Sequence, residues 1–449
     1  MKKFVVSVGL VALGATGAQA GPAPSPLDGE GSRPWSVSMR LRGFYDDNIN
    51  GLPDNVAPAN GHRDTFGFEV APRLVVSWPL EQTTIGFSYD YGLKYYQNRP
   101  SGNTENYDQT HTFMASLDHT FNERYQLSLK DSFVIGQEPD KLRAGNTFDS
   151  FQRIPGNNIR NYASVEFNAQ LTPRFGLVAG YANALYDYAD DNFTDFPSPV
   201  PPVGVFNVTP SNSGTLDSIN HTFHLDGRWQ IKPSTIGVVG YQFSDMYYTA
   251  GEPISGTISN GVVTSTRYLS DVRNNRSHYG YVGVDHTFTP TLSGSLRGGA
   301  RYNSYYNDPY NQNEPSPYFM ASLKYAYMTS SSAELGFSYD RSASQSFSEL
   351  PGQSLTTDAQ TATAWLSVRQ KITGKLTGTL TAQFQDSTYN GGTLNGETDL
   401  YYLLGLNLEY RFNPHFAMDT GYNYDRLDSD LSGRSFDRNR VYIGLTATY

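Results

Sequence analysis

Long and short connections alternate along this chain of 449 residues, and that alternation constrains its fold more than any other feature. Segments in which apolar residues recur at every second position are predicted strands, because side chains of a strand point alternately to its two faces. Nine long polar stretches and eight very short connections separate these segments, which gives 18 predicted strands. A soluble sandwich or propeller does not explain such a rhythm.

The short connections carry residues that turns prefer. Four have proline as their middle residue, as in Thr172-Pro173-Arg174. The longest polar stretches are Gln137–Asn157, Asp187–Asp217 and Thr249–Asn275. The eight predicted turns are Pro79–Gln82, Asn122–Arg124, Thr172–Arg174, Lys232–Ser234, Thr289–Thr291, Thr329–Ser332, Thr373–Lys375 and Asn413–His415.

The last strand, Arg438 to Tyr449, has an uninterrupted period of two. Its apolar face is formed by Val441, Ile443, Leu445, Ala447 and Tyr449. A terminal strand with an unpaired edge invites aggregation. Pairing with the first predicted strand, Trp35 to Tyr45, would remove that edge and close the chain into one barrel. An even strand number places both ends of the barrel on the same side.

This closing strand resembles the C-terminal recognition strand of Gram-negative outer-membrane β-barrels, which alternates in the same way and ends in an aromatic residue, most often Phe. The whole pattern is similar to that of the putative β-barrel porin family, whose members have a signal peptide, Tyr-rich strands and no plug domain. The resemblance implies an all-β, transmembrane, antiparallel up-and-down β-barrel of about 18 strands (16–18), with short periplasmic turns and long outer loops. It also implies outer-membrane lipid as surroundings, insertion by the barrel-assembly machinery through the C-terminal strand, and compatibility with a homotrimer.

Aromatic residues form two belts on the apolar faces, as expected at the two interfaces of a bilayer. Near the short turns lie Trp78, Phe121, Trp229 and Phe288, and toward the long loops lie Tyr95, Tyr241, Tyr302 and Tyr422. The segment Tyr125 to Ile135 breaks the pattern, because Asp131 falls on its apolar face. A carboxylate facing lipid is costly, so we expect a β-bulge or different strand limits there.

The first 20 residues have the pattern of a cleaved signal peptide. Lys2 and Lys3 precede an apolar stretch, and Ala18-Gln19-Ala20 forms a small-residue cleavage site. Residues 21–34 are predicted to be a short periplasmic lead, and residues 35–449 a single barrel. The signal and the closing strand together predict a location in the cell outer membrane.

Composition excludes several kinds of chemistry. The chain has no Cys, so it has neither disulfides nor thiol chemistry. Without Lys2 and Lys3, 31 basic residues stand against 43 acidic ones, a net charge of −12 that argues against nucleic acid as a partner. No G-x-S-x-G segment and no metal-ligand spacing occur. The sequence therefore predicts a non-enzymatic protein with no catalytic residues, no metal and no cofactor.

The faces opposite the apolar ones carry charges of both signs, which would line the interior. A barrel of 16–18 strands leaves an aqueous channel, where we expect these charges to stay solvated. The candidate pore-lining residues are Arg40, Arg42, Glu69, Arg73, Lys94, Glu166, Arg228, Arg297, Arg301, Glu334, Arg369, Glu409 and Arg411.

A selective pore needs a constriction. In general porins the third outer loop folds inward, and the same ordinal loop here is Gln137–Asn157. The longer, Pro-rich loop Asp187–Asp217 is an alternative. The candidate constriction residues of the third loop are Asp140, Lys141, Arg143, Asp149 and Arg153.

The resemblance implies a porin-like channel for passive diffusion of small hydrophilic solutes. Three alternatives remain at this point. The first is a barrel that exports an exopolysaccharide, which predicts a strong excess of one charge sign at the constriction. The second is a structural or adhesive surface barrel whose lumen is plugged by loops. The third, more distant, is a soluble secreted β-protein, which would need no detergent.

Overall fold

The structure is a computed structural model. It describes residues 33–49, 51–53, 62–99, 105–137, 156–190, 205–207, 210–255, 257–259, 262–263, 268–310, 313–344 and 355–449. The predicted signal peptide lies outside the described residues, and so does most of the predicted periplasmic lead. Both therefore stay predictions.

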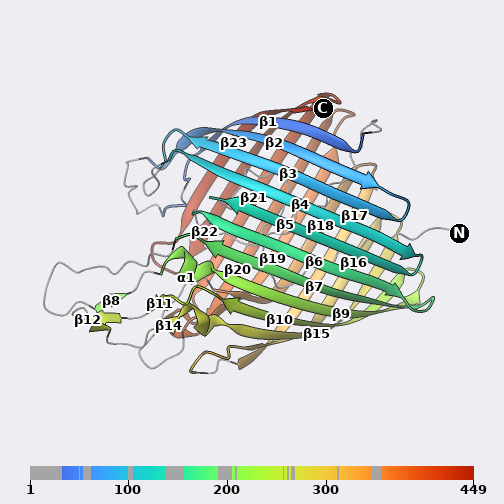
Figure 1. The fold of residues 1–449 in the computed structure, drawn as a ribbon. Helices are drawn as coiled ribbons and strands as arrows, with labels where there is room; N and C mark the ends of the chain where they lie inside the picture. Colours follow the sequence, from blue (N-terminus) through green and yellow to red (C-terminus); the bar gives the residue numbers. More distant parts are fainter. Residues whose placement is uncertain are drawn as a thin grey trace.

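Eighteen antiparallel strands form one closed sheet, and Figure 1 shows them inclined side by side around a barrel. Each strand pairs with its neighbours in the sequence, so the up-and-down order is confirmed. The strands are β1 (Trp35–Asp46), β2 (Thr65–Pro79), β3 (Thr83–Tyr96), β4 (Tyr107–Asn122), β5 (Tyr125–Gly136), β6 (Asn158–Gln170), β7 (Phe175–Tyr188), β9 (Ser218–Lys232), β10 (Thr235–Tyr248), β15 (Asn275–Thr289), β16 (Leu292–Ser304), β17 (Asn313–Met328), β18 (Ser331–Ala343), β19 (Asp358–Lys371), β20 (Leu376–Asn390), β21 (Thr398–Asn413), β22 (Phe416–Ser429) and β23 (Phe436–Thr448).

The barrel closes where the last strand meets the first, as the sequence predicts. β23 pairs with β1 from Thr448 opposite Ser38 to Arg440 opposite Asp46. The backbone of Val37 exchanges two hydrogen bonds with that of Tyr449, at 3.0 and 2.8 Å. No strand of the main sheet is left with a free edge, so the aggregation hazard of an edge is removed.

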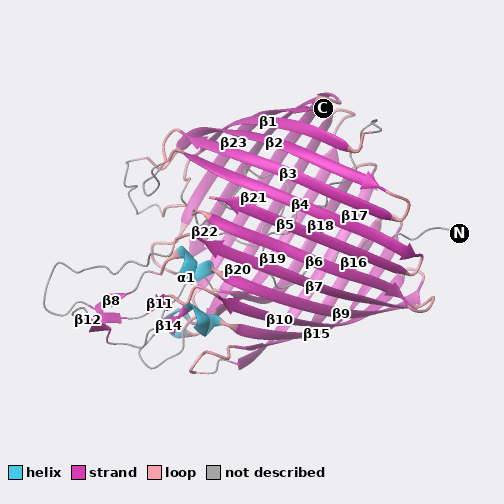
Figure 2. Cartoon of the chain, in the orientation of Figure 1, coloured by secondary structure: helices cyan, strands magenta, loops and turns pink. Residues whose placement is uncertain are grey.

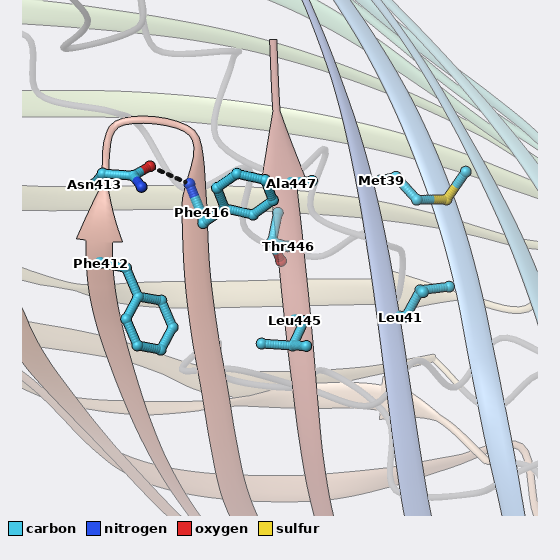
Figure 3. Close-up of a pocket in the computed structure, with 8 residues that line it drawn as sticks. All are labelled: Met39, Leu41, Phe412, Asn413, Phe416, Leu445, Thr446 and Ala447. Atoms are coloured by element: carbon cyan, nitrogen blue, oxygen red, sulfur yellow. Dashed lines mark hydrogen bonds between the residues drawn. The ribbon is translucent and has the colours of Figure 1, made fainter.

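Most of the short turns share one hydrogen-bond pattern. A side-chain oxygen at the first turn residue accepts hydrogen bonds from the backbone N–H groups two and three residues later, which mimics a backbone turn. Asn413 Oδ1 accepts from His415 N at 2.8 Å and from Phe416 N at 2.9 Å, the second of which is drawn in Figure 3. Asn122, Thr172, Thr289 and Thr373 do the same. These five short turns therefore follow from local chemistry.

The outward face of the barrel is apolar over most of its height. Large hydrophobic side chains are exposed at alternate positions on most of the strands, which in water would be unfavourable. At the closing seam they line a shallow groove on the outer wall, shown in Figure 3 and lined by Met39, Leu41, Phe412, Asn413, Phe416, Leu445, Thr446 and Ala447. Such a wall needs a lipid surrounding rather than water.

Two local expectations are wrong. The pairing of β5 with β6 runs without a register shift from Tyr125 to Gly136, so no bulge turns Asp131 inward. Its carboxylate stays on the outward face, where Asn161 Nδ2 donates a hydrogen bond to it at 2.9 Å. The turn predicted at Thr329–Ser332 is shorter, because β18 already begins at Ser331 and Ser330 takes a positive φ of 62°.

The long loops carry small elements of their own at the end of the barrel opposite the short turns. Figure 2 shows α1 (Asn212–Leu216) at the ends of the strands, and β8 (Val205–Asn207) and β12 (Thr257–Ser259) lying beyond them. No described helix is long and apolar enough to cross a membrane. The remaining elements are β11 (Pro253–Ser255), β13 (Val262–Val263), β14 (Tyr268–Leu269), η1 (Ser270–Arg273) and η2 (Gly392–Leu394).

Candidate functional site: the inner face of the barrel

All thirteen candidate pore-lining residues occupy strand positions that alternate with the outward apolar positions, so they lie on the inner face. Arg40 and Arg42 alternate with Met39 and Leu41, for example. Their surroundings differ with height along the barrel. Toward the long loops the described inner side chains are mostly buried, whereas toward the short turns many are exposed. The inner face therefore has a packed outer half and a more open half near the short turns.

A charged network crosses the closing seam in the outer half. The Arg42 guanidinium lies between two carboxylates: its Nη2 is 2.5 Å from Asp419 Oδ2, and its Nη1 is 3.9 Å from Glu69 Oε2. It also lies over the ring of Tyr442, 4.5 Å from the centroid, in a cation–π contact. Arg40 Nη2 approaches Glu69 Oε1 at 2.7 Å. Four strands, β22, β23, β1 and β2, are thus linked across the seam.

A second network lies on β9, β15 and β16. Asp285 accepts from two arginines, Arg297 Nη2 at 2.7 Å and Arg228 Nη2 at 3.0 Å. Ser295 Oγ donates to the same carboxylate at 2.9 Å. Asp285 thus joins β9, β15 and β16 through ion pairs with two arginines.

Arg301 belongs to a third network, with mainly neutral partners. Its Nη2 lies 3.0 Å from Ser277 Oγ, and its Nη1 lies 3.4 Å from Asp340 Oδ1. The guanidinium is 4.9 Å from the ring centroid of Tyr279, whose hydroxyl donates to Asp340 at 3.1 Å. The group thus spans from β15 to β18 along the wall.

The charges nearer the short turns are less enclosed. Arg411 Nε contacts Glu409 Oε1 at 2.7 Å, yet these side chains are 62% and 37% exposed. Arg369 is exposed, and Glu334 lies opposite Lys324 in the register. Glu166 accepts from Asn168 Nδ2 at 2.9 Å. These groups can meet solute without first breaking a buried ion pair.

Two candidates on β2 and β3 occupy intermediate positions. Arg73 Nε lies 3.2 Å from Asp90 Oδ1, and 41% of the Arg73 side chain is exposed. Lys94 stands opposite Glu69 in the pairing of the two strands. Together with Arg40, these residues place three cations and two carboxylates close to the seam network.

The expectation that the wall charges stay solvated is therefore wrong for the outer half. The side chains of Arg42 and Glu69 are only 4% and 5% exposed, and Arg297 and Arg301 are also buried. Their carboxylate partners and neighbouring tyrosines take the place of water, as buried charges require. Which strands meet across the wall decides these pairs, and the sequence pattern does not contain that information.

Inward-facing aromatic rings are part of the wall that the sequence pattern did not reveal. Tyr281 donates to Asp226 Oδ1 at 2.5 Å, and its ring lies against Gly240, where a Cβ would come within 2.2 Å of the ring. Trp365 lies in the same way against Gly336, where a Cβ would come within 2.0 Å. Glycine at these two positions lets a ring lie flat against the wall. A Gly on the strand next to an inward aromatic is the signal that could have found them.

The outer mouth is bordered by loops that pack against one another. Arg273, in η1, donates from Nη1 to Thr215 O of α1 at 2.8 Å and lies over the ring of Tyr248 at 3.7 Å. Its burial lowers the pKa of the guanidinium. Ile254, Tyr268, Val272 and Leu355 form a small apolar cluster beside it. Loops from three different hairpins are thus joined here.

The five candidate constriction residues of the third outer loop, Asp140, Lys141, Arg143, Asp149 and Arg153, lie outside the described residues. Their role stays a prediction. The described parts of the competing loop, β8 and α1, lie at or beyond the ends of the strands (Figure 1). Within the described part of the chain, no group of three or more His, Asp or Glu side chains could hold a metal ion.

Solved structures with a similar fold include outer-membrane proteins of two bacteria. The crystal structure of opdK from Pseudomonas aeruginosa aligns with a TM-score of 0.43 and 11% identity, over 92% of this chain and 99% of that one. OccAB4 from Acinetobacter baumannii aligns with a TM-score of 0.43 and 13% identity, over 92% and 98%. The siderophore receptor PiuA from Acinetobacter baumannii aligns with a TM-score of 0.47 and 11% identity, over 92% of this chain and 81% of that one. At these TM-scores and identities, no property of those proteins is assigned to this chain.

No curated protein matches this chain. A family model does match its C-terminal part, which contains the strands from β19 to the closing strand β23. Residues 352–449 match the family described as Putative beta-barrel porin 2, so the resemblance predicted from the sequence is confirmed over this part of the barrel.

Proposed function

We propose that this protein is a non-enzymatic outer-membrane channel for passive diffusion of small hydrophilic solutes. The observation that carries the proposal is a closed 18-strand barrel with an apolar outer face and an inner face rich in charged residues. Barrels of this size are wide enough to leave an aqueous path between their inner side chains. The match of residues 352–449 to a porin family supports the same function.

The predicted export signal and the apolar outer wall support a location in the outer membrane. With the short turns facing the periplasm, the packed half of the inner face lies toward the cell exterior. The candidate pore-lining residues with the most exposed side chains would contact solute most directly. Arg73 and Arg411 are such residues, at 41% and 62% exposure.

The charges on the inner wall favour a general channel over a dedicated exporter. Both signs are present in all three networks, around Arg42, Asp285 and Arg301. An exporter of a charged polysaccharide would need a strong excess of one sign along its path. The described wall has no such excess.

A plugged surface barrel is the second candidate, and one observation favours it. The loops of the outer mouth are joined around Arg273 by hydrogen bonds and apolar packing. A rigid outer surface of this kind suits contact with another cell or with a large ligand. In this alternative the lumen would not pass solutes at all.

Liposome swelling distinguishes these functions. The refolded protein is placed in vesicles loaded with an impermeant polysaccharide and diluted into isotonic solutions of uncharged sugars of increasing size. The proposal expects swelling that is fast for the smallest sugar and slower for each larger one. Folded protein that produces no more swelling than empty vesicles, even for the smallest sugar, would overturn it and favour the plugged barrel.

A further inference from the structure

The outward wall carries a row of three polar side chains on β9, β10 and β15. His221, Asp245 and Arg276 lie directly opposite one another on these adjacent strands. Residues that are directly opposite in paired strands point to the same side of a sheet. That side is the outward one, because Val239 and Val282, each six residues from a member of the row, are 65% and 62% exposed.

The row lies at the level of lipid headgroups. His221, Asp245 and Arg276 are 11, 10 and 13 residues from the short-turn ends of their strands. With a strand rise of about 3.4 Å per residue and a tilt of about 40°, they lie roughly 25–35 Å above the short turns, at or beyond the edge of an apolar band about 25 Å tall. The exposed rings of Tyr302 and Tyr306 belong to the same interface.

The Arg276 guanidinium is held by its neighbours and still faces outward, with 51% of the side chain exposed. Its Nε lies 3.4 Å from Asp245 Oδ2, and its Cζ is 4.9 Å from the ring centroid of Tyr306. The Tyr247 hydroxyl donates to the same Asp245 oxygen at 2.6 Å and is also a partner of the guanidinium. A guanidinium has five N–H donors, which is more than Asp245 and Tyr247 accept. Arg276 therefore keeps donors for an outside ligand.

Two histidines share this outward face with Arg276. His278 stands two residues from Arg276 on β15, and its Nδ1 is 2.7 Å from the Tyr241 hydroxyl. His221 Nδ1 is 2.9 Å from the Tyr181 hydroxyl. A hydroxyl that donates to Nδ1 leaves the ring proton on Nε2. Among the described residues none bonds to either Nε2, so both can donate to a partner outside the barrel.

A second outward arginine, Arg426 on β22, has a different setting. It stands ten residues from the short-turn end of its strand, and 47% of its side chain is exposed. Its Nη2 lies 3.4 Å from Asp428 Oδ2, and its Nε lies 3.8 Å from Asp437 Oδ1. Two carboxylates surround Arg426, whereas one carboxylate and two imidazoles surround Arg276. An anion is therefore attracted to Arg276 and repelled at Arg426.

The wall between the row and the short turns suits a lipid chain. Gly280 on β15 is open, because an added Cβ would meet no atom within 4 Å. It lies opposite Tyr241 on one side and Ala300 on the other. One step nearer the short turns, the exposed side chains of Val239 and Val282 stand opposite each other. A chain that leaves the row over Gly280 would bury apolar surface along its length.

We propose that Arg276, His221 and His278 bind the phosphate-bearing headgroup of an outer-leaflet lipid. An arginine fork matches two phosphate oxygens with two parallel hydrogen bonds. The Nε2 groups of the two imidazoles donate to further headgroup oxygens. The row spans two strand spacings, about 10 Å, so it fits a headgroup with several polar groups better than a single free ion. This inference does not depend on whether the lumen passes solutes.

Native mass spectrometry in mild detergent tests the site with diphosphoryl lipid A, whose saccharide headgroup carries two phosphates. Wild-type protein should bind this lipid more tightly than its phosphate-free form. Arg276→Gln should raise the dissociation constant by about tenfold or more, as the loss of hydrogen bonds to a charged group predicts. The matched control Arg426→Gln should leave it unchanged. Equal effects of the two substitutions, or equal binding of the two lipids by wild type, would overturn the proposal.

The charge of the bound group is tested by Asp245→Asn. The amide removes a negative charge beside the ligand and keeps an acceptor for Tyr247, so phosphate should bind several-fold more tightly. Weaker binding would mean that the carboxylate itself contacts a cationic group, which contradicts the proposal. An excess of inorganic phosphate should leave the lipid bound. Its displacement by inorganic phosphate would assign the site to a free ion instead of a lipid.

Lipid retained from native outer membranes gives a readout that does not depend on added ligand. Phosphorus per chain, measured after gel filtration in mild detergent, should be lower in Arg276→Gln than in wild type. Arg426→Gln should match wild type. All three proteins should show the same heat-modifiable gel mobility, because both arginines lie on the outward surface. Equal phosphorus contents in folded Arg276→Gln and wild type would contradict the site.

Discussion

Replacing Arg42 by alanine should destabilise the barrel far more than replacing Arg411. Both arginines sit on the inner wall and contact a carboxylate at 2.5–2.7 Å, but they differ in burial. The Arg42 and Asp419 side chains are 4% and 11% exposed, whereas Arg411 and Glu409 are 62% and 37% exposed. Removing one partner of a buried pair costs about 3–5 kcal/mol, and an exposed pair contributes about 0.2–1 kcal/mol.

Water near the lumen lessens the cost, so we expect a loss of about 3 kcal/mol for Arg42→Ala, a change of about 100-fold in the folding equilibrium. Arg411→Ala should cost less than about 1 kcal/mol. The assay is urea-induced unfolding in lipid vesicles, followed by the fluorescence of the four Trp residues. The double variant Arg42→Ala/Asp419→Ala should recover part of the loss, because the uncompensated carboxylate is then absent. Equal losses for the two single variants would show that water reaches Arg42 freely and would refute the packed outer half.

Three further perturbations probe other parts of the molecule. Gly336→Ala should lower single-channel conductance, because the new Cβ would come within 2.0 Å of the Trp365 ring and push that ring into the lumen. The control is Gly280→Ala, whose new Cβ would have no neighbouring atom within 4 Å and should leave conductance unchanged. Tyr449→Ala should reduce the amount of folded protein in the outer membrane, measured by heat-modifiable gel mobility, because the ring centroids of Tyr449 and Trp35 lie 6.0 Å apart across the closing seam. Tyr449→Phe should give a near-normal amount of folded protein. Equal yields for the two variants would contradict a role for the ring. Thr398 donates to Asp430 from Oγ1 at 2.6 Å and from its amide at 2.9 Å, which lowers the pKa of the carboxyl. Because a carboxyl with a lowered folded pKa loses its stabilising effect as pH falls through that value, exchange of the Thr398 amide should accelerate relative to its neighbours only below about pH 4. In Asp430→Asn that acceleration should be absent, and its persistence would contradict the assignment.

The barrel could be predicted from sequence because its determinants are local. Five of the short turns have a side chain that fixes the turn, such as that of Asn413 or Thr172. Most strands show their outward face by the alternation of apolar residues. Closure follows from the even strand number and from the last strand's need for a partner. No long-range information enters these steps.

The pairing and burial of the side chains on the inner wall could not be predicted in the same way. Arg42 and Asp419 are separated by 377 positions in the sequence and meet only because the barrel closes between them. Inward rings such as Tyr281 look apolar in the sequence and are accommodated by glycines on a neighbouring strand, such as Gly240. The loop contacts of Arg273 depend on loops of different hairpins meeting at the mouth.

Single-channel recording of the refolded mature protein in a planar bilayer tests the central claim most directly. A diffusion channel should give steady openings in simple salt, with only a modest charge preference in the reversal potential, because the wall carries both signs. Absence of conductance from protein that circular dichroism shows to be folded β-structure in the bilayer would contradict the diffusion channel.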